Sequence, residues 1–368
     1  MSLLRTYQLD GAQQTDRRPP CIGVSLPDAS SVDAIAAWDA IAHSLCLCPI
    51  AGQAEADLRI TVAETALDAH PPLGGTRVAS DERGTVWRTL DGWFWTATGF
   101  RVAAAREGTT ARLLLDMDMS PDDRSMVQGY AFRHALTMLL PRTGWMPLHG
   151  AGLCPPASDT TTGEAPALLL VGPSGTGKST LAAGLLQRGW HCISDDLLLL
   201  SPPDADDALT AWSLTRTIRL CRDAWQRLGF ADSERQEANR LGTADVFGGT
   251  ADGQSKYSVS PRPLEQSADG PPRGCPSHVI FPELSSTSQS RLDPVERIHA
   301  LPNVLKQMQP SALLSPSDAE TQLNHVATML RATDIYRLRA GRDLYDDPGL
   351  IADLLNEPPV SASTSRGP

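Results

Sequence analysis

The sequence lacks the features that would place it among membrane or nucleic-acid-binding proteins. Its 368 residues contain no apolar run near membrane-spanning length, and the first ten residues lack a basic start followed by an apolar stretch. We therefore expect no signal peptide, no membrane partner and a cytoplasmic location. Positive charge is outnumbered, with 32 Lys and Arg against 43 Asp and Glu, a net charge of −11. Nucleic acid is a poor partner for such a chain, because neutralised phosphates supply most of that affinity.

The seven cysteines lack the paired spacing of a metal site. No C-x-x-C pair occurs, and the close pair Cys46 and Cys48 has no second pair at a usable distance. Two small thiols on a strand are the better interpretation of this pair. The scattered, odd-numbered cysteines are typical of reduced thiols, which suit a cytosolic protein.

Residues 171–180 read VGPSGTGKST and contain a complete Walker A phosphate-binding loop, G-x-x-x-x-G-K-S. An apolar run at 167–171 predicts the strand that delivers the loop, and a helical pattern follows at 178–188. The loop N–H groups can wrap a phosphate, which the positive end of the helix dipole also favours. The pattern predicts binding of a nucleotide, expected to be ATP, by Gly172, Pro173, Ser174, Gly175, Thr176, Gly177, Lys178, Ser179 and Thr180.

Two aspartates, Asp195 and Asp196, follow the strand predicted at 190–193. The C-terminal ends of parallel strands meet at one edge of a sheet, so we expect this pair beside Lys178 and Ser179. Lys178 can reach the β- and γ-phosphates, and Ser179 can bind Mg²⁺. One carboxylate can accept the proton of an attacking hydroxyl while the other, taken as Asp195, holds the metal. The residues alone leave the two roles interchangeable.

His149 is the third candidate for the site. It lies in a strand predicted at 145–153, which we expect beside the strand that delivers the loop. A histidine there could contact the γ-phosphate or the aspartate pair. A purely structural histidine is the alternative interpretation.

These segments together resemble the HPr kinase/phosphorylase family, a group of P-loop proteins with a PEP-carboxykinase-like fold. The resemblance covers about 148–200: LHGA at 148–151, the loop, a helix ending in Arg-Gly, and the Asp-Asp pair. It is closest to the smaller HPr-kinase-related bacterial serine kinases, some of which phosphorylate serines of ribosomal peptide precursors. It implies Lys178 at the transferred phosphate, Ser179 at the metal, His149 near the phosphates and Asp196 as proton acceptor beside Asp195.

Some family features have no match in this sequence. The later glycine-rich signature with an arginine, which accompanies phosphorylase activity, is not found, nor is the downstream metal-binding glutamate. These departures argue against a reverse phosphorylase reaction. The related kinases are often oligomeric, so a homo-oligomer is compatible with the resemblance, although no residue pattern establishes a subunit contact.

The chain divides by pattern into an α/β P-loop domain of HPr kinase type at 146–357 and a smaller, β-rich α+β domain at 1–145. In the first part, short apolar stretches predict antiparallel strands, with helices at 31–45 and 121–140. Trp87, Trp93 and Trp95 are expected on one face of a hairpin, where packing within the β-layer is the better interpretation and an aromatic surface that grips a ligand is the alternative. This domain is expected to take part in substrate selection. A polar, glycine-rich stretch at 231–276 predicts a mobile insert or lid, and 358–368 a disordered tail.

The sequence favours an ATP-dependent kinase that phosphorylates a serine or threonine of a peptide or small protein. A metabolite kinase is the first alternative, because such enzymes also place carboxylates after the loop helix. A transporter-type ATPase is less favoured, because a Leu-Ser-Gly-Gly-Gln-like signature and an Asp-Glu strand end are missing. A nucleotide-binding regulator without turnover is disfavoured by the intact lysine, serine and aspartate pair.

Overall fold

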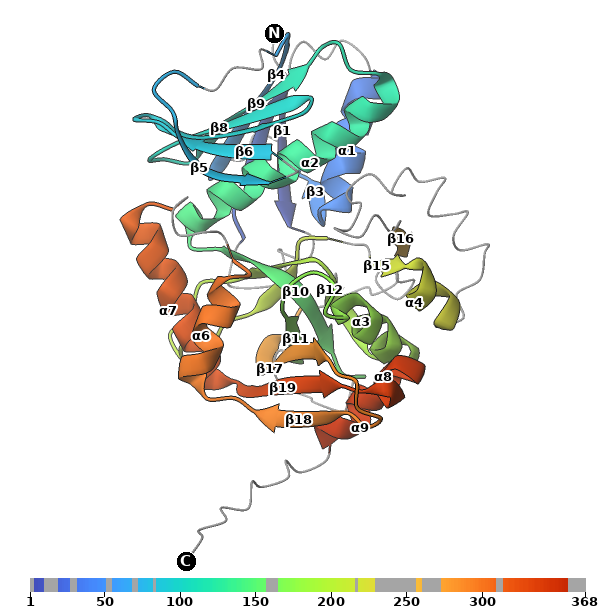
Figure 1. Cartoon of the computed structure of the whole chain (residues 1–368). Helices are drawn as coiled ribbons and strands as arrows, with labels where there is room; N and C mark the ends of the chain where they lie inside the picture. The colour runs from blue at the N-terminus through green and yellow to red at the C-terminus, as the bar shows by residue number, and fades with distance from the viewer. Residues whose placement is uncertain are drawn as a thin grey trace, which may run out of the picture.

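The computed structural model describes residues 3–9, 19–26, 32–50, 55–67, 72–81, 84–156, 165–215, 218–228, 256–259, 273–308 and 314–356. These residues form a mixed α/β structure with two large sheets and helices packed against each (Figure 1). The strands of the first sheet end at Asp116, and those of the second begin at Met146. The α/β class expected from the sequence is confirmed at this level.

In the described residues, the first sheet has nine strands in the order β3-β1-β2-β4-β9-β8-β7-β6-β5. Their bounds are β1 Leu3–Leu9, β2 Ile22–Leu26, β3 Leu47–Pro49, β4 Leu58–Thr65, β5 Thr76–Asp81, β6 Gly84–Arg88, β7 Gly92–Ala97, β8 Phe100–Ala105 and β9 Thr110–Asp116. The expectation of antiparallel strands is wrong for β2, β4 and β9, which pair in parallel. Parallel neighbours need a crossover connection, and helix α1 (Val32–Ser44) lies in the chain between β2 and β4.

Helices α1 and α2 (Pro121–Leu139) cover one face of the first sheet (Figure 1). Pro121 suits the first turn of α2, where its missing N–H group costs no helical hydrogen bond. The buried side chains of the two helices, including Trp38 and Phe132, form one apolar core with Phe100 and Leu113 of the strands. This core fixes α2 against the sheet.

The three tryptophans of β6 and β7 do not share a face, contrary to the sequence expectation. The strand register pairs Trp87 with Phe94 and Val86 with Trp95. Trp93 is 5% exposed and packs, with Trp95, into the core beneath the helices. Trp87 therefore lies on the opposite face, and a single aromatic surface made from all three is ruled out.

The second sheet follows the order β14-β13-β10-β11-β17-β19-β18, and β12 also pairs with β10. The bounds are β10 Met146–Cys154, β11 Pro166–Val171, β12 His191–Ser194, β13 Leu197–Leu200, β14 Ala211–Ser213, β17 Cys275–Leu284, β18 Arg291–Pro294 and β19 Asp334–Ala340. Strands β11, β17 and β19 are parallel. Strand β10 runs antiparallel to β11 on one side and to β12 and β13 on the other. Strands β15 (Ile218–Cys221) and β16 (Lys256–Val259) form a separate antiparallel pair.

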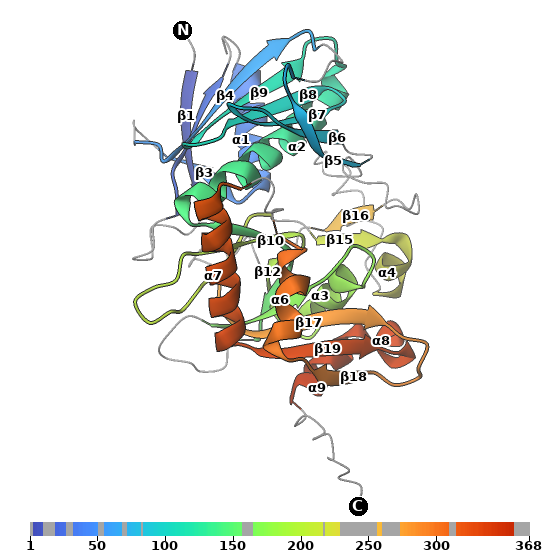
Figure 2. The ribbon, with the colours of Figure 1, turned by 60° about the vertical axis from the view of Figure 1, so that its left-hand side comes forward.

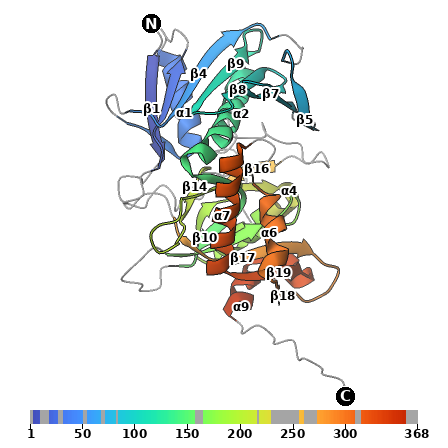
Figure 3. The same ribbon diagram turned by 90° about the vertical axis from the view of Figure 1, so that its left-hand side faces the viewer.

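Helices cover both faces of the second sheet (Figure 2). Helices α3 (Lys178–Gln187), α8 (Arg342–Asp346) and α9 (Ile351–Asn356) share one core with the strands, and α6 (Arg297–Leu305) and α7 (Pro316–Ala332) share another. The shorter helical segments are η2 Leu140–Thr143, α4 Arg222–Arg227 and η5 Pro348–Leu350. Figure 3 shows α7 rising along the second half of the molecule toward the end of α2.

Strand β13 joins the cores of the two halves. Its four leucines are all buried, and Leu197 and Leu199 belong to the core beneath α1 and α2. Leu198 and Leu200 belong instead to the core beneath α6 and α7. Successive side chains of a strand point to opposite faces, so one apolar run serves both halves. The core beneath α1 and α2 therefore contains residues from both sides of the proposed domain boundary. The division into domains 1–145 and 146–357 stays a prediction.

Two predicted segments fall largely beyond the described part of the chain. Of the predicted insert at 231–276, the structure describes β16 and residues 273–276, and the predicted tail at 358–368 lies outside the described residues altogether. Among the helices that are described, none combines the length and apolar character that crossing a bilayer requires.

Candidate active site

The loop predicted to bind phosphate connects β11, which ends at Val171, to α3, which begins at Lys178. Gly175 and Gly177 have φ angles of 86° and 92°, a region that glycine enters without steric cost. A Cβ added to either glycine meets nothing within 4 Å, so the space over this part of the loop is open. Gly177 is the N-cap of α3, and the first-turn N–H groups of the helix are therefore directed at this space.

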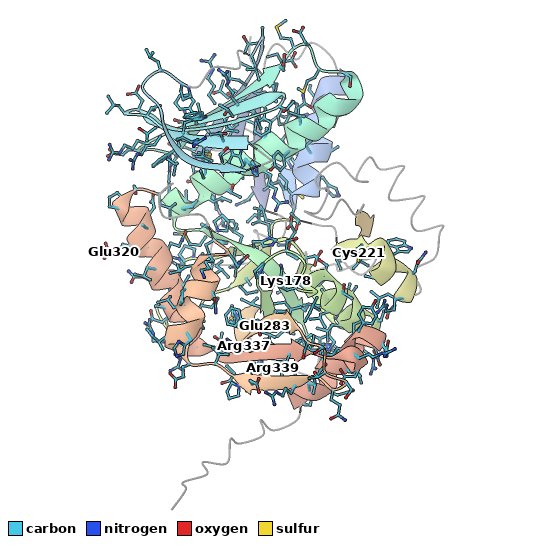
Figure 4. The ribbon with its side chains drawn as sticks, in the orientation of Figure 1. Lys178, Cys221, Glu283, Glu320, Arg337 and Arg339 are labelled. Carbon is cyan, nitrogen blue, oxygen red and sulfur yellow. The ribbon has the colours of Figure 1, made fainter. Side chains whose placement is uncertain are left out.

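Lys178 is folded back over the loop and is only 6% exposed. Its Nζ donates hydrogen bonds to the carbonyl oxygens of Gly172, at 2.6 Å, and Pro173, at 2.9 Å. Thr176 Oγ1 donates to the Pro173 carbonyl at 3.0 Å. Figure 4 labels Lys178 at the centre of the molecule, near β10 and α3. The ammonium group thus lies inside the loop, from which a bound phosphate could draw it.

Three other predicted loop residues are more exposed than Lys178. Ser174 is exposed at the tip of the loop, and Ser179 and Thr180 are half-buried in the first turn of α3. Their position places the two hydroxyl groups one turn or less from the start of the helix.

Gly150 of β10 connects the loop with the aspartate pair across the sheet. It is paired with Val171 on one side, and its N–H donates to the carbonyl oxygen of Asp196 on the other at 3.3 Å. Neighbouring strands lie about 4.8 Å apart, so the backbones of Val171 and Asp196 are separated by about 10 Å. We expected adjacent parallel strands to bring the aspartates beside the loop. The neighbour of β11 on this side is instead the antiparallel strand β10, so that expectation is corrected. β12 nevertheless runs in the same direction as β11, and both strands end at one edge.

The aspartate pair occupies a bend between β12 and β13, which both pair with β10. Ser194 fixes the bend, because its Oγ donates to the Leu197 carbonyl at 2.9 Å and lies 2.8 Å from Thr215 Oγ1. Asp195 is 3% exposed and turned toward the interior. Burial raises the pKa of the Cys192 thiol, and the Asp195 carboxylate is close enough to raise it further. The two aspartates therefore lie in different environments.

The side chain of Asp196 is held by residues from two other elements. Arg133 Nη1 of α2 lies 2.5 Å from Asp196 Oδ2, and His149 Nδ1 of β10 lies 3.2 Å from Asp196 Oδ1. His149 Nδ1 is also 3.0 Å from the carbonyl oxygen of Asp196. Both of these oxygens are acceptors, which assigns the proton to Nδ1 and leaves Nε2 as an acceptor in neutral His149. The imidazole side chain remains 37% exposed.

The two predicted magnesium donors lie in different settings: Ser179 is half-buried in the first turn of α3, whereas Asp195 is 3% exposed and turned toward the interior. Magnesium is usually held by one or two carboxylates or hydroxyls together with water and the phosphates of a nucleotide. Ser179 and Asp195 are the oxygen donors that would hold it here. The described residues contain no cluster of three or more His, Cys, Asp or Glu that could hold a metal by themselves.

Sequence reasoning missed Arg133 and the surroundings of Glu283. Helix α2 is predictable from its pattern, but nothing local indicates that its arginine reaches a residue in the other half of the chain. Glu283 lies near the end of β17, the parallel neighbour of β11, and pairs with Arg337 of β19 at 3.1 Å (Figure 4). It is therefore a further carboxylate at the edge of the sheet where the loop lies.

Comparison with known proteins leaves the family open. No protein-family model matches the chain, and no curated protein matches it in sequence. Among solved structures, the HPr(Ser) kinase/phosphatase from Coxiella burnetii aligns with 57% of this chain and 93% of its own. The two share 12% sequence identity with a TM-score of 0.27. This likeness is too low to carry a functional argument, which rests instead on the residues described above.

Proposed function

We propose that the protein is an ATP-dependent kinase that transfers the γ-phosphoryl group to a serine or threonine hydroxyl of a peptide or small protein. The observation that carries the proposal is the position of Gly150, paired with Val171 at the start of the loop and hydrogen-bonded to Asp196. The backbones of Val171, at the start of the nucleotide loop, and of Asp196 are thereby kept about two strand spacings, about 10 Å, apart. That distance leaves room for a phosphoryl group and an acceptor hydroxyl.

In the proposed reaction, the acceptor oxygen forms a bond to the γ-phosphorus while the bond from that phosphorus to the β,γ-bridging oxygen breaks. The hydroxyl proton passes to the carboxylate of Asp196, and ADP leaves with the bridging oxygen. Lys178 stabilises the charge on the transferring group. Magnesium, when bound, neutralises charge on the β- and γ-phosphates, and Ser179 with Asp195 would hold it.

His149 has an orienting role in this proposal. Its Nδ1–H is directed at Asp196, so in neutral His149 the Nε2 lone pair remains available to accept a hydrogen bond from the acceptor hydroxyl. We place the reaction in the cytoplasm, as the sequence composition favours, with a peptide or small protein as partner, as the resemblance over about 148–200 implies. The acceptor itself is defined by chemistry alone, as a primary or secondary alcohol.

The test is to incubate the full-length protein with Mg²⁺, ATP labelled at the γ-phosphate and the small proteins encoded beside its gene. Label on a serine or threonine of a peptide supports the proposal. Label on a metabolite would replace it with a metabolite kinase, and label released only as free phosphate would replace it with an ATPase. Lys178→Ala protein, prepared in the same way, measures any contaminating kinase.

A further inference from the structure

The ion pair between Arg133 and Asp196 joins distant parts of the chain. Arg133 belongs to α2, which packs on the first sheet, and Asp196 lies at the bend before β13 of the second sheet. Their side chains are 17% and 20% exposed, so water screens this 2.5 Å contact far less than it would a surface pair. Charge-assisted hydrogen bonds from a guanidinium group also have a defined direction.

Packing on both sides of the ion pair fixes where Arg133 lies. Phe132 and Leu136 of α2 are 0% exposed and belong to the same apolar core as Leu197, the residue directly after Asp196. The helix and the strand therefore cannot move apart without opening that core. The backbone that carries Arg133 is therefore packed into the same core as the residue that follows Asp196.

The carboxylate of Asp196 is held at both oxygens. Arg133 of α2 contacts Oδ2, and His149 of β10 contacts Oδ1. A carboxylate with one donor can rotate about its Cβ–Cγ bond, whereas donors on both oxygens fix its plane. Arg133 of α2 and His149 of β10 both contact this carboxylate, and Asp195 precedes Asp196 in the chain.

We propose that Arg133 is a positioning residue that holds the Asp196 carboxylate in the orientation needed to accept the acceptor proton. The inference rests on the proposed function, in which Asp196 is the proton acceptor. It makes α2, and with it the first half of the chain, a structural part of the catalytic site in addition to any part in choosing the substrate. Misplacing a reacting group by about 1 Å can lower a rate about a hundredfold.

The test compares full-length wild type with Arg133→Met, Arg133→Lys and a control, Arg59→Met, whose arginine is exposed on β4. The kcat and KM for Mg·ATP hydrolysis, with water as acceptor, are measured together with the Kd of ATP by calorimetry. We expect Arg133→Met to lower kcat about tenfold to a hundredfold while KM and Kd change less than about twofold. Arg133→Lys should recover part of the loss, and Arg59→Met should match wild type.

Three outcomes would overturn the positioning role. The first is an unchanged kcat in Arg133→Met. The second is a loss of ATP affinity in Arg133→Met that parallels its loss of kcat. The third is an Arg133→Lys variant that keeps wild-type thermal stability but recovers none of the lost kcat. The second of these would indicate general damage to the fold instead of a misplaced carboxylate.

A double-mutant cycle separates this inference from the proposed function. The denaturation midpoints of Arg133→Met, Asp196→Asn and the double variant are measured without nucleotide. We expect the double variant to lose less stability than the sum of the single losses, because the second change removes a partner already lost. Additive losses would overturn the contact itself. Wild type that shows the coupling but transfers label from γ-labelled ATP to no acceptor, neither a peptide nor water, would overturn the proposed function.

Discussion

Gly150 runs so close to Leu170 that a Cβ added to the glycine would lie 2.8 Å from the leucine carbonyl oxygen. That distance is shorter than a side-chain carbon can approach, and a backbone oxygen within a sheet cannot turn aside. Gly150→Ala should therefore push β10 away from β11 and disturb the spacing between the loop and Asp196. We expect a lower melting temperature and slower ATP turnover, measured by thermal denaturation and a phosphate-release assay.

Gly129 of α2 provides the matched control for Gly150. A Cβ added there meets only Ile41 Cγ2, at 3.9 Å, which is an ordinary contact distance. Alanine within a helix is more stable than glycine by about 0.5–1 kcal/mol, so Gly129→Ala should raise the melting temperature. If Gly150→Ala melts at the wild-type temperature, the close approach of β10 to β11 is wrong.

Lys178→Ala should abolish ATP turnover. The variant removes the ammonium group proposed for the β- and γ-phosphates and also the two hydrogen bonds to the Gly172 and Pro173 carbonyls. We expect the Kd of ATP to rise and phosphate release to fall to background in the same preparation. Lys306→Ala, which removes an exposed lysine after α6, is the control. Full turnover in Lys178→Ala would place the nucleotide site elsewhere.

Asp196→Asn should lower the rate of the chemical step by about two to four powers of ten, the usual effect of losing a general base. The amide keeps the shape of the side chain but cannot take the proton. Single-turnover measurements with saturating ATP isolate this step from nucleotide binding.

Asp195→Asn is the companion to that variant. Because Asp195 is proposed to hold magnesium, its loss should raise the Mg²⁺ concentration needed for half-maximal rate more than it lowers the rate at saturation. If Asp195→Asn abolishes the chemical step and Asp196→Asn leaves it intact, the two roles are reversed.

The candidate site was predictable where its chemistry is local and not where it depends on distant packing. The loop, its strand and its helix follow from consecutive residues, because backbone conformation there is set by glycine and by the lysine and serine that follow. The register that places Gly150 between Val171 and Asp196 requires the pairing of three strands. The contribution of Arg133 depends on how α2, packed on the first sheet, lies beside the bend at Asp196, and no pattern in 121–140 encodes that placement.

The fold shows the same limit in two particular places. The leucines of β13 predict a strand buried on both faces, but only packing shows that Leu197 and Leu198 belong to different cores. Simple alternation of side chains along the chain predicts Trp87 on the same face as Trp93, because their positions differ by an even number of residues. The hairpin register pairs Trp87 with Phe94, an odd residue with an even one, so the turn reverses which face each position occupies.

His325 should make the stability of the protein depend on pH. This α7 residue is 4% exposed, and its Nδ1–H donates to the Thr321 carbonyl at 2.8 Å. Burial lowers its pKa in the folded protein below the ordinary value of 6.5, and the hydrogen bond to the Thr321 carbonyl acts in the opposite direction. As the pH falls through 6.5, the unfolded chain takes up a proton at His325 that the folded protein does not. Stability is therefore present above this pH and is lost progressively below it.

The measurement is the melting temperature of wild type and His325→Gln between about pH 7.5 and pH 5.5, which spans the ordinary histidine pKa. The variant is expected to start lower, because it loses a buried hydrogen bond, but to lose less stability as the pH falls. His299→Gln is the matched control, since that imidazole is 73% exposed near Glu296 and its removal should leave the pH slope of wild type in place. An identical pH slope in wild type and His325→Gln would show that the buried imidazole does not carry the effect.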